Sequence, residues 1–381
     1  MTILFLHSLL YLSQALLIYA GTHRLTYPKT KSLPKISILV ALRNEDVTLE
    51  TCVNSLLRLD YPRNKIEIIL INDRSTDGSA AMIEHFKEIS RMVKTVHIRY
   101  CIKGLSGKAN AIAQGIEHST GELILVTDGD CCVPRGWAKA HVSYYQPQVG
   151  IVSGFTLLDK KFDSTPLFGK IQSLDWVYLL SVGAGSIGMG VPLSVLGNNF
   201  SFRRCAYDQV GGYRNMGFTI IEDFALMKTV HKKTSWKVLY PIDKEMVVYS
   251  YPMPTFKKFY EQRKRWSAGG KEVGLYGKLL MTISYVNHIL LPLSFLLLNN
   301  PVFSLAALVC VLLSDFFLLS HTTGRVGRKD VLRYFPLWEI FYFFYTTLFA
   351  LVLLFPTKVN WKGMTYSWKF NWKLKKVVDK Q

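Results

Sequence analysis

The sequence predicts an α/β domain with a mainly parallel sheet, joined to one N-terminal and two to three C-terminal transmembrane helices. Two observations lead to this fold class. Between about residues 36 and 252, short β-branched runs alternate with helical stretches, which is typical of a parallel sheet with helices on both faces. On either side of that region lie apolar runs close to the roughly 20 residues that a helix needs to cross a bilayer.

Each predicted strand is a short run rich in isoleucine, leucine and valine, as expected for strands buried on both faces. These runs are KISILVAL, KIEIILIND, VKTVHIRY and ELILVTDGD, and the helical stretches between them include VTLETCVNSLLRL and SAAMIEHFKEI. Ligands of parallel sheets sit at the carboxyl ends of the strands. Polar residues fall there in this chain: Asp73 follows one strand, and Asp128 and Asp130 follow another.

The N-terminal segment 1–21 is predicted to be a transmembrane anchor. Residues Ile3 to Ala20 are almost uninterruptedly apolar, without the basic start and small-residue cleavage site of a removable signal peptide. Basic residues follow this run, at Arg24, Lys29, Lys31 and Lys35. The positive-inside rule therefore predicts that the catalytic region 36–252 lies in the cytoplasm.

The C-terminal region 281–355 contains three further apolar runs, at about 281–298, 302–320 and 336–355. The basic loop between the last two runs and the basic, Trp-rich tail 356–381 should both be cytoplasmic. A single span cannot connect two segments on the same side. Because 336–355 also contains Glu339 and two tyrosines, we expect that it does not cross the membrane in a simple way.

Two segments next to the predicted spans are candidates for the membrane surface. Residues 253–272 mix lysine and arginine with aromatic residues, which predicts an amphipathic interfacial helix. A solvated basic helix is the less favoured alternative. Residues 174–196 are unusually apolar and rich in glycine, and they fit an interfacial element or a buried core helix equally well.

The net charge of +19, from 46 basic and 27 acidic residues, indicates a polyanionic partner. No zinc-finger spacing or aromatic RNA-binding motif is present, so the apolar segments favour a membrane surface and a phosphorylated substrate over nucleic acid. The six cysteines show no disulfide or metal-site spacing, which fits a reduced cytoplasmic domain.

Several short motifs fall at the ends of successive predicted strands. Asp128-Gly129-Asp130 can hold a divalent cation that neutralises a diphosphate. Asp73 can accept hydrogen bonds from a nucleoside, and Arg43-Asn44-Glu45 ends the first strand in a similar way. Lys108 lies at the start of a helix, and the start of a helix favours binding of a diphosphate. Each motif alone is equally typical of a capped turn. Their order along the chain is what indicates a common site.

Over residues 36–270 the chain resembles the family 2 glycosyltransferases with a GT-A fold. The matching motifs are Arg43-Asn44-Glu45, Asn72-Asp73 with Ser75-Thr76-Asp77, Asp128-x-Asp130, Glu222-Asp223 and Gln262-x-x-Arg265-Trp266. The last motif marks the membrane-associated branch, which includes cellulose, hyaluronan and poly-N-acetylglucosamine synthases and ceramide glucosyltransferases. Two departures, Gly129 and Ile221 at positions where many relatives have alanine and threonine, remove no carboxylate.

The resemblance implies a role for each matching residue. Arg43, Glu45, Asp73, Lys108, Asp128 and Asp130 should bind the nucleotide sugar, with Asp130 and Asp128 holding Mg²⁺ or Mn²⁺. Asp223 should be the general base that deprotonates the acceptor hydroxyl. The acceptor and leaving-group site should comprise Asn199, Glu222, Gln262, Arg265 and Trp266.

The resemblance also implies an inverting transfer from a nucleotide-diphosphate sugar, with UDP-hexose or UDP-N-acetylhexosamine as the expected donor. The preferred acceptor is a membrane lipid or lipid-linked molecule, because few charged residues lie in the predicted spans to line an export channel. The alternative is a processive β-polysaccharide synthase that extrudes its product, with a homo-oligomer or accessory membrane subunit. A non-catalytic membrane scaffold is a minor alternative. The expected location is the bacterial inner membrane.

Overall fold

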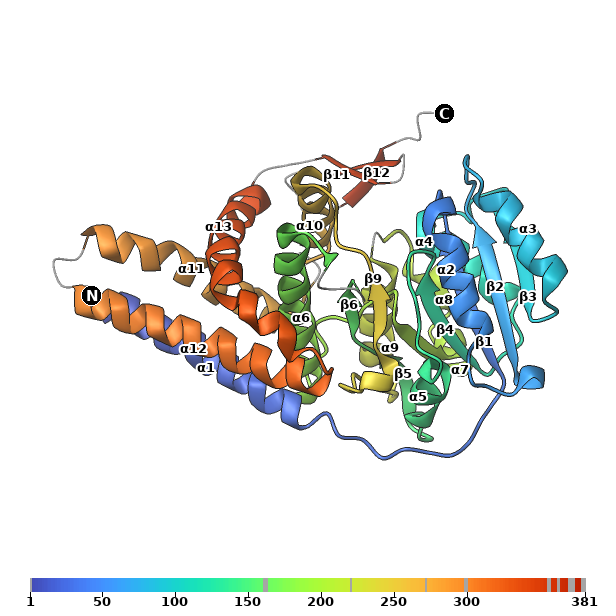
Figure 1. Ribbon diagram of the computed structural model, residues 1–381, viewed down its shortest axis with the longest axis horizontal. Helices are drawn as coiled ribbons and strands as arrows, with labels where there is room; N and C mark the ends of the chain where they lie inside the picture. The colour runs from blue at the N-terminus through green and yellow to red at the C-terminus, as the bar shows by residue number, and fades with distance from the viewer. Residues whose placement is uncertain are drawn as a thin grey trace.

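The predicted strand runs form one half of a seven-stranded sheet with the order β3-β2-β1-β4-β7-β5-β8 (Figure 1). The computed structural model describes residues 2–159, 164–219, 221–270, 273–297, 301–354, 358–361, 364–368 and 374–377. In this half, the parallel strands are β1 (Ile36–Leu42), β2 (Ile66–Asn72), β3 (Val93–His97) and β4 (Leu123–Asp128). The prediction of a mainly parallel α/β sheet is therefore confirmed.

The other half of the sheet contains strands that the sequence analysis did not identify. The strand β7 (Phe200–Arg203) runs antiparallel to both β4 and β5 (Val149–Ser153), and β8 (Lys237–Leu239) pairs in parallel with β5. A second, two-stranded sheet joins β6 (Thr156–Leu158) to β9 (Val248–Ser250). These strands have three to five residues each, too few for a clear sequence pattern.

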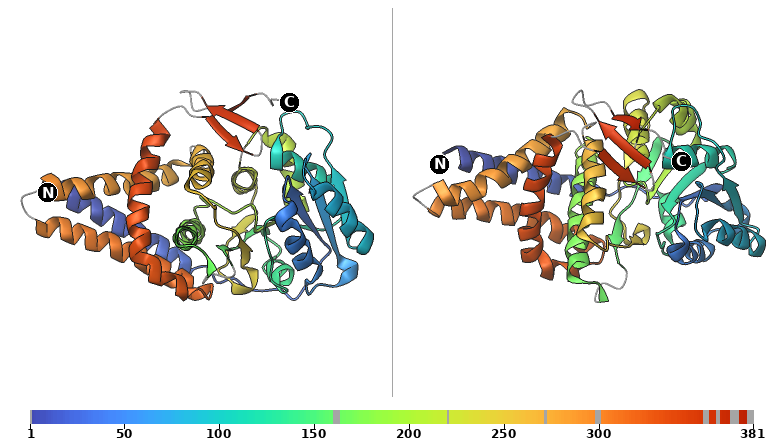
Figure 2. Two further views of the ribbon diagram at one scale, coloured as in Figure 1. Left: turned by 45° about the horizontal axis from the view of Figure 1, so that its top comes forward. Right: turned by 90° about the horizontal axis from the view of Figure 1, so that it is seen from above.

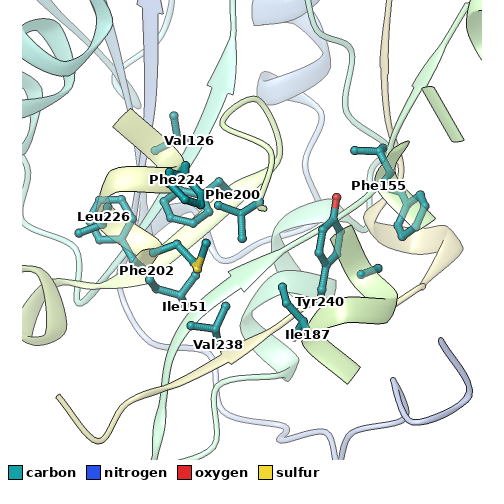
Figure 3. Packing of buried hydrophobic residues seen from close by; sticks show 14 of the residues in the cluster. Val126, Ile151, Phe155, Ile187, Phe200, Phe202, Phe224, Leu226, Val238 and Tyr240 are labelled. Atoms are coloured by element: carbon teal, nitrogen blue, oxygen red, sulfur yellow. The ribbon is translucent and has the colours of Figure 1, made fainter. Parts of the chain in front are cut away.

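Helices cover both faces of the main sheet (Figure 1). The helices of this domain are α2 (Asp46–Leu57), α3 (Ser79–Ile89), α4 (Gly107–Glu117), α5 (Trp137–Ser143), α7 (Arg204–Gln209), α8 (Gly212–Met216) and α9 (Glu222–Lys233). Figure 3 shows how α9 is held against the sheet: its Phe224 and Leu226 pack beside Phe200 and Phe202 of β7 and Val126 of β4. The start of α9 is thus fixed next to the end of β4.

Three long apolar helices form a bundle that projects from the α/β domain: α1 (Thr2–His23), α11 (Leu275–Leu297) and α12 (Pro301–Arg325). Each is long and apolar enough to cross a membrane. Large apolar side chains on these helices, including Leu10, Leu296 and Val302, are exposed by 52%, 79% and 65%, as expected for a surface that contacts lipid. The start of α1, the end of α11 and the start of α12 lie at the same far end of the bundle (Figure 1).

A layer of three helices separates this bundle from the α/β domain. It comprises α6 (Leu167–Gly188), α10 (Phe256–Gly270) and α13 (Phe335–Leu354), and all three run across the direction of the bundle in both views (Figures 1 and 2). One face of α13 packs inward through Trp338 and Tyr342, which are 0% and 7% exposed. On its other face Ile340 and Phe344 are 59% and 69% exposed. We call α6, α10 and α13 the transverse layer.

The course of α13 differs from that of the three bundle helices. The helix α12 returns the chain to the domain end of the bundle, and α13 then runs across the bundle rather than along it. The segment Lys329–Tyr334 before α13 and the small sheet after it both lie toward the domain end of the bundle. The predicted tail contains an antiparallel sheet of β10 (Lys358–Trp361), β11 (Met364–Trp368) and β12 (Leu374–Val377), which the sequence analysis missed. Residues 298–300, between the first two C-terminal apolar runs, and much of the predicted tail 356–381 lie outside the described residues.

Glycines allow α1 and α6 to approach each other closely. A Cβ atom on Gly185 would lie 2.4 Å from the carbonyl oxygen of Ile18, and one on Gly188 would lie 2.0 Å from that of Gly21. Small residues permit such backbone contacts between membrane helices. Residues 174–188 of the glycine-rich segment 174–196 therefore belong to a buried helix that fastens the anchor to the transverse layer, and residues 189–196 follow its end without regular structure.

We predict that Gly185→Ala destabilises the protein, because the added methyl group forces α1 and α6 apart at a cost of about 1–3 kcal/mol. Gly183 on the same helix is the matched control, since a Cβ there meets its first neighbour at 3.5 Å. Replacing a helical glycine by alanine without a clash gains about 0.5–1 kcal/mol. Thermal unfolding in detergent should show a lower Tm for Gly185→Ala and an equal or higher Tm for Gly183→Ala. Equal Tm values for the two variants would contradict the close contact.

Candidate active site

A single pocket of about 650 Å³ lies at the carboxyl ends of the parallel strands and extends to the transverse layer. All but one of the site residues predicted from the sequence line it. They are Arg43, Glu45, Asp73, Lys108, Asp128, Asp130, Glu222, Asp223, Gln262, Arg265 and Trp266. Residues separated by more than two hundred positions in the chain are thus gathered around one space.

The loops after β1 and β2 are tied together by short polar side chains. The backbone N–H of Asn44 donates to Ser75 Oγ at 3.1 Å, and that of Thr76 donates to Asn44 Oδ1 at 2.8 Å. Asn44 has a φ of 57°, a left-handed conformation that asparagine tolerates better than most residues. Asp73 is 5% exposed and accepts a hydrogen bond from Arg74 Nε at 3.0 Å. The two loops therefore form a fixed polar wall at one end of the pocket.

Asp128 and Asp130 sit at the end of β4, on either side of Gly129. A Cβ atom on Gly129 would lie 3.2 Å from Glu45 Cγ, so this position brings the loops after β1 and β4 into close contact. Asp130 accepts a hydrogen bond from Ser250 Oγ at 3.1 Å. Both aspartates are half-buried and line the pocket. Their carboxylates are therefore held in place while still facing the pocket.

Lys108 forms the electrostatic centre of the site. Its ammonium group lies 2.6 Å from Asp128 Oδ1 and 3.3 Å from Glu222 Oε1, and donates to the Gly197 carbonyl oxygen at 3.1 Å. Burial alone would lower the pKa of Lys108, but the Asp128 and Glu222 carboxylates outweigh burial and raise it. The lysine therefore remains charged and joins the end of β4 to the start of α9.

Asp223 is the second residue of α9, and it projects beside Gly197. A Cβ atom on Gly197 would lie 2.9 Å from Asp223 Oδ2, so glycine makes room for the carboxylate. Burial and the negative charge of Glu222 raise the pKa of Asp223 from 3.8 to about 7, against the opposing effect of Lys108. A carboxylate with such a pKa can accept a proton near neutral pH.

The helix α10 presents the Gln262-x-x-Arg265-Trp266 motif to the pocket, with Gln262, Arg265 and Trp266 on one face. Arg263 does not line the pocket: it is 2% exposed and pairs with the fully buried Asp175 of α6. The Arg263 guanidinium also lies 4.2 Å from the ring centroid of Trp266. Sequence reasoning missed this pair, whose partners are 88 residues apart. It links α10 to α6 directly behind the motif.

Asn199, predicted to contact the acceptor, does not line the pocket. It is 0% exposed, and its amide group donates to the carbonyl oxygens of Phe155 and Met246 and accepts from Trp137 and His141. These four hydrogen bonds use its full capacity. The preceding residue, Asn198, lines the pocket instead. The structure thus gives Asn199 a structural role under the site.

We predict that Arg263→Met destabilises the protein strongly, because it leaves the buried Asp175 carboxylate without its partner, a loss of about 3–5 kcal/mol. The double variant Arg263→Met with Asp175→Leu removes both charges and should recover most of that loss. Thermal unfolding of the two variants measures the difference. A double variant as unstable as the single one would show that the pair is not the main contribution.

Relatives of this chain are bacterial glycosyltransferases and polysaccharide synthases. The chain is 26% identical over 249 residues to the "Probable glycosyltransferase YdaM" of Bacillus subtilis, covering 64% of this chain and 57% of that protein. It is 27% identical over 241 residues to the poly-β-1,6-N-acetyl-D-glucosamine synthase of Staphylococcus epidermidis, covering 62% of this chain and 55% of that protein. The chain thus spans little more than half the length of these relatives.

The fold and the family are established by the remaining comparisons. The mannosyltransferase PcManGT from Pyrobaculum calidifontis, solved in complex with GDP-Man and Mn²⁺, superposes with a TM-score of 0.55 at 19% identity. The match covers 91% of this chain and 99% of that one, which shows the shared fold. The model of "Glycosyl transferase family 2" matches residues 37–170, and that of "Glycosyl transferase family group 2" matches residues 123–357. The resemblance to family 2 glycosyltransferases is thus confirmed, and the chain belongs to glycosyl transferase family group 2.

Proposed function

We propose that this protein is an inverting glycosyltransferase that moves a sugar from a nucleotide-diphosphate donor to a membrane lipid or lipid-linked acceptor. One observation carries the proposal. A single pocket contains the strand-end carboxylates Asp73, Asp128 and Asp130 at one end, and Asp223 with the aromatic residues Trp176 and Trp266 toward the transverse layer. Donor and acceptor can therefore meet in this pocket.

The proposed reaction is a single displacement. Asp223 takes the proton of an acceptor hydroxyl, whose oxygen attacks the anomeric carbon of the donor sugar. The bond from that carbon to the diphosphate oxygen breaks, and the nucleoside diphosphate leaves with the bonding electrons. Because attack comes from the face opposite the leaving group, the anomeric configuration inverts. Lys108 and Arg265 are the protein cations proposed to stabilise the departing diphosphate.

The residues at the end of β4 fit a divalent cation. Asp128 and Asp130 both face the pocket and offer the carboxylate oxygens that Mg²⁺ and Mn²⁺ prefer, and diphosphate oxygens and water can supply further ligands. The cation would neutralise charge on the leaving diphosphate. The ammonium group of Lys108 lies 2.6 Å from Asp128 Oδ1 and so fixes the position of that carboxylate beside the pocket.

The nucleoside is proposed to bind at the wall formed by the loops after β1 and β2. Arg43, Glu45 and Asp73 line this end of the pocket. Asp73 is fixed by its own backbone N–H, which donates to the Leu42 carbonyl oxygen at 2.9 Å, and by Arg74. The resemblance favours UDP as the nucleotide, carrying a hexose or an N-acetylhexosamine.

The acceptor is proposed to enter from the membrane side. Apolar residues line the end of the pocket near the transverse layer, including Trp176, Trp266, Leu196, Ile221 and Met253. The exposed apolar stripe on α13 and its course across the bundle support a position at the membrane surface for this layer. An acceptor anchored in the bilayer would thus reach Asp223 without leaving the membrane.

The proposed topology places the α/β domain in the cytoplasm. Arg24 follows α1 directly, and Arg325, Arg328 and Lys329 follow or end α12, so basic residues gather at the domain end of the bundle. This distribution supports a cytoplasmic domain by the positive-inside rule. We place the protein in a bacterial inner membrane.

A processive β-polysaccharide synthase is the second candidate function. The similarity to poly-β-1,6-N-acetyl-D-glucosamine synthases supports it. Extrusion of a polymer would require a polar path through the membrane, supplied by a second copy or an accessory subunit. Three buried polar side chains, Tyr11 of α1, Tyr178 of α6 and Asp315 of α12, are instead hydrogen-bonded to one another, with Tyr11 donating to Asp315 at 2.8 Å. This internal pairing favours the lipid acceptor.

We predict that purified protein releases UDP from a UDP-sugar in the presence of Mn²⁺ or Mg²⁺ and a total lipid extract. Asp223→Asn should lower the rate by about 10²–10⁴-fold, because the substitution removes the general base. The control is Asp60→Asn, whose side chain is 62% exposed and remote from the pocket, and it should keep full activity. A coupled assay for UDP, with extraction of a radiolabelled product, measures both release and acceptor.

The form of the labelled product distinguishes the two functions. Label in the lipid fraction supports single transfer, whereas a labelled polymer would establish the processive synthase. No release from any UDP- or GDP-sugar by folded protein would contradict the glycosyltransferase proposal and support the scaffold alternative.

We also predict that kcat/KM falls as the pH drops below about 7, because protonated Asp223 cannot act as a base. Folding raises the pKa of Asp223, so this group also affects the free energy of unfolding. Its contribution to folding stability is full below the unfolded pKa and is lost as the pH rises through the folded pKa. Glu222→Gln removes a neighbouring negative charge and should move the acidic limb of the profile to lower pH. An unchanged midpoint in Glu222→Gln would exclude Asp223 as the titrating group.

A further inference from the structure

A second pocket, of about 400 Å³, lies where the anchor helix meets the α/β domain. It is lined by Arg24 and Tyr27 beyond α1, by the end of α6, and by His231, Trp236 and Lys237 at the end of α9 and the start of β8. We call it the anchor pocket. It lies at the opposite end of α9 from Asp223, so it is separate from the active-site pocket.

The lining of the anchor pocket is basic. Arg24, His231 and Lys237 are exposed, and the lining residues include no aspartate or glutamate. A further cation lies close by, because Arg325 at the end of α12 donates to the Thr22 carbonyl oxygen at 3.3 Å. The dipole of α9 accounts for basic residues in its own last turn. It does not account for Arg24 and Lys237, which belong to other elements.

The position of the pocket decides what kind of anion it fits. Arg24 is the first residue after α1, so it lies at the level where a membrane helix meets the headgroups. Trp236, whose indole Nε1 donates to Gln209 at 2.8 Å, lines the same pocket and suits such a boundary. Basic pockets beside membrane helices on the cytoplasmic side bind anionic lipid headgroups.

We propose that the anchor pocket binds the phosphate of an anionic phospholipid headgroup. The phosphate would sit between Arg24 and Lys237, while the acyl chains lie along the exposed apolar side of α1. Through this contact the lipid would join the end of the anchor to β8 and α9 of the α/β domain. This site goes beyond the proposed function, and its occupancy does not depend on sugar transfer.

Native mass spectrometry of the full chain in detergent tests the proposal. Phosphatidylglycerol, phosphatidylcholine and inorganic phosphate are each titrated against the wild-type protein. We expect phosphatidylglycerol to bind more tightly than phosphatidylcholine. The double variant Arg24→Gln with Lys237→Gln should bind phosphatidylglycerol at least about tenfold more weakly, since each basic residue near a membrane surface contributes substantially to anionic lipid binding.

Two control variants keep the test decisive if the double variant is poorly folded. Arg24→Lys with Lys237→Arg retains both charges and should retain the preference for phosphatidylglycerol. Lys87→Gln with Arg91→Gln removes the same charge from the far side of the domain, at the end of α3 and beyond it, and should bind as the wild type does. An equal loss in this last variant, or no loss in Arg24→Gln with Lys237→Gln, overturns the proposal. Inorganic phosphate that competes as well as the lipid overturns the assignment to a lipid headgroup.

Discussion

The site depends on holding several carboxylates together at one edge of a sheet. Asp128, Glu222 and Asp223 come from β4 and the start of α9, and their mutual repulsion would separate these elements if nothing opposed it. Lys108 opposes it by contacting Asp128 and Glu222 at 2.6 and 3.3 Å. The hydrophobic contact of Phe224 with the strands below supplies the second restraint (Figure 3). The positive charge of a bound divalent cation and the negative charge of the donor diphosphate would complete the balance of charge at this edge.

The transverse layer gives this charged edge its relation to the membrane. Because Gln262, Arg265 and Trp266 of α10 line the pocket while the neighbouring Arg263 pairs with Asp175, the same helix lines the pocket and binds α6. In turn α6 meets α1 through glycine contacts that leave almost no space between the two backbones. A continuous set of contacts thus runs from the anchor to the pocket. Movement of the anchor relative to the sheet would alter the catalytic geometry.

Much of this architecture could be predicted from the sequence, because the parallel strands are continuous apolar runs and their ends carry distinctive polar residues. The parts that could not be predicted depend on tertiary contacts. The pairing of Asp175 with Arg263 joins residues 88 positions apart, and neither residue belongs to a pattern by itself. Asn198 and Asn199 are adjacent just before β7, and only the packing of Asn199 against Trp137 and His141 decides which of them faces the pocket. The course of α13 follows from aromatic packing on α6, which hydropathy does not report.

The central claim is that one pocket brings the acceptor to the face of the sugar opposite the departing diphosphate, with Asp223 as the base. The most direct test is the anomeric configuration of the product, measured by the ¹H coupling constant of the transferred sugar in its NMR spectrum. An α-linked donor should give a β-linked product, because a single displacement inverts the anomeric carbon. An α-linked product would contradict the account, since retention requires a second displacement or a front-face mechanism that this arrangement of Asp223 does not support.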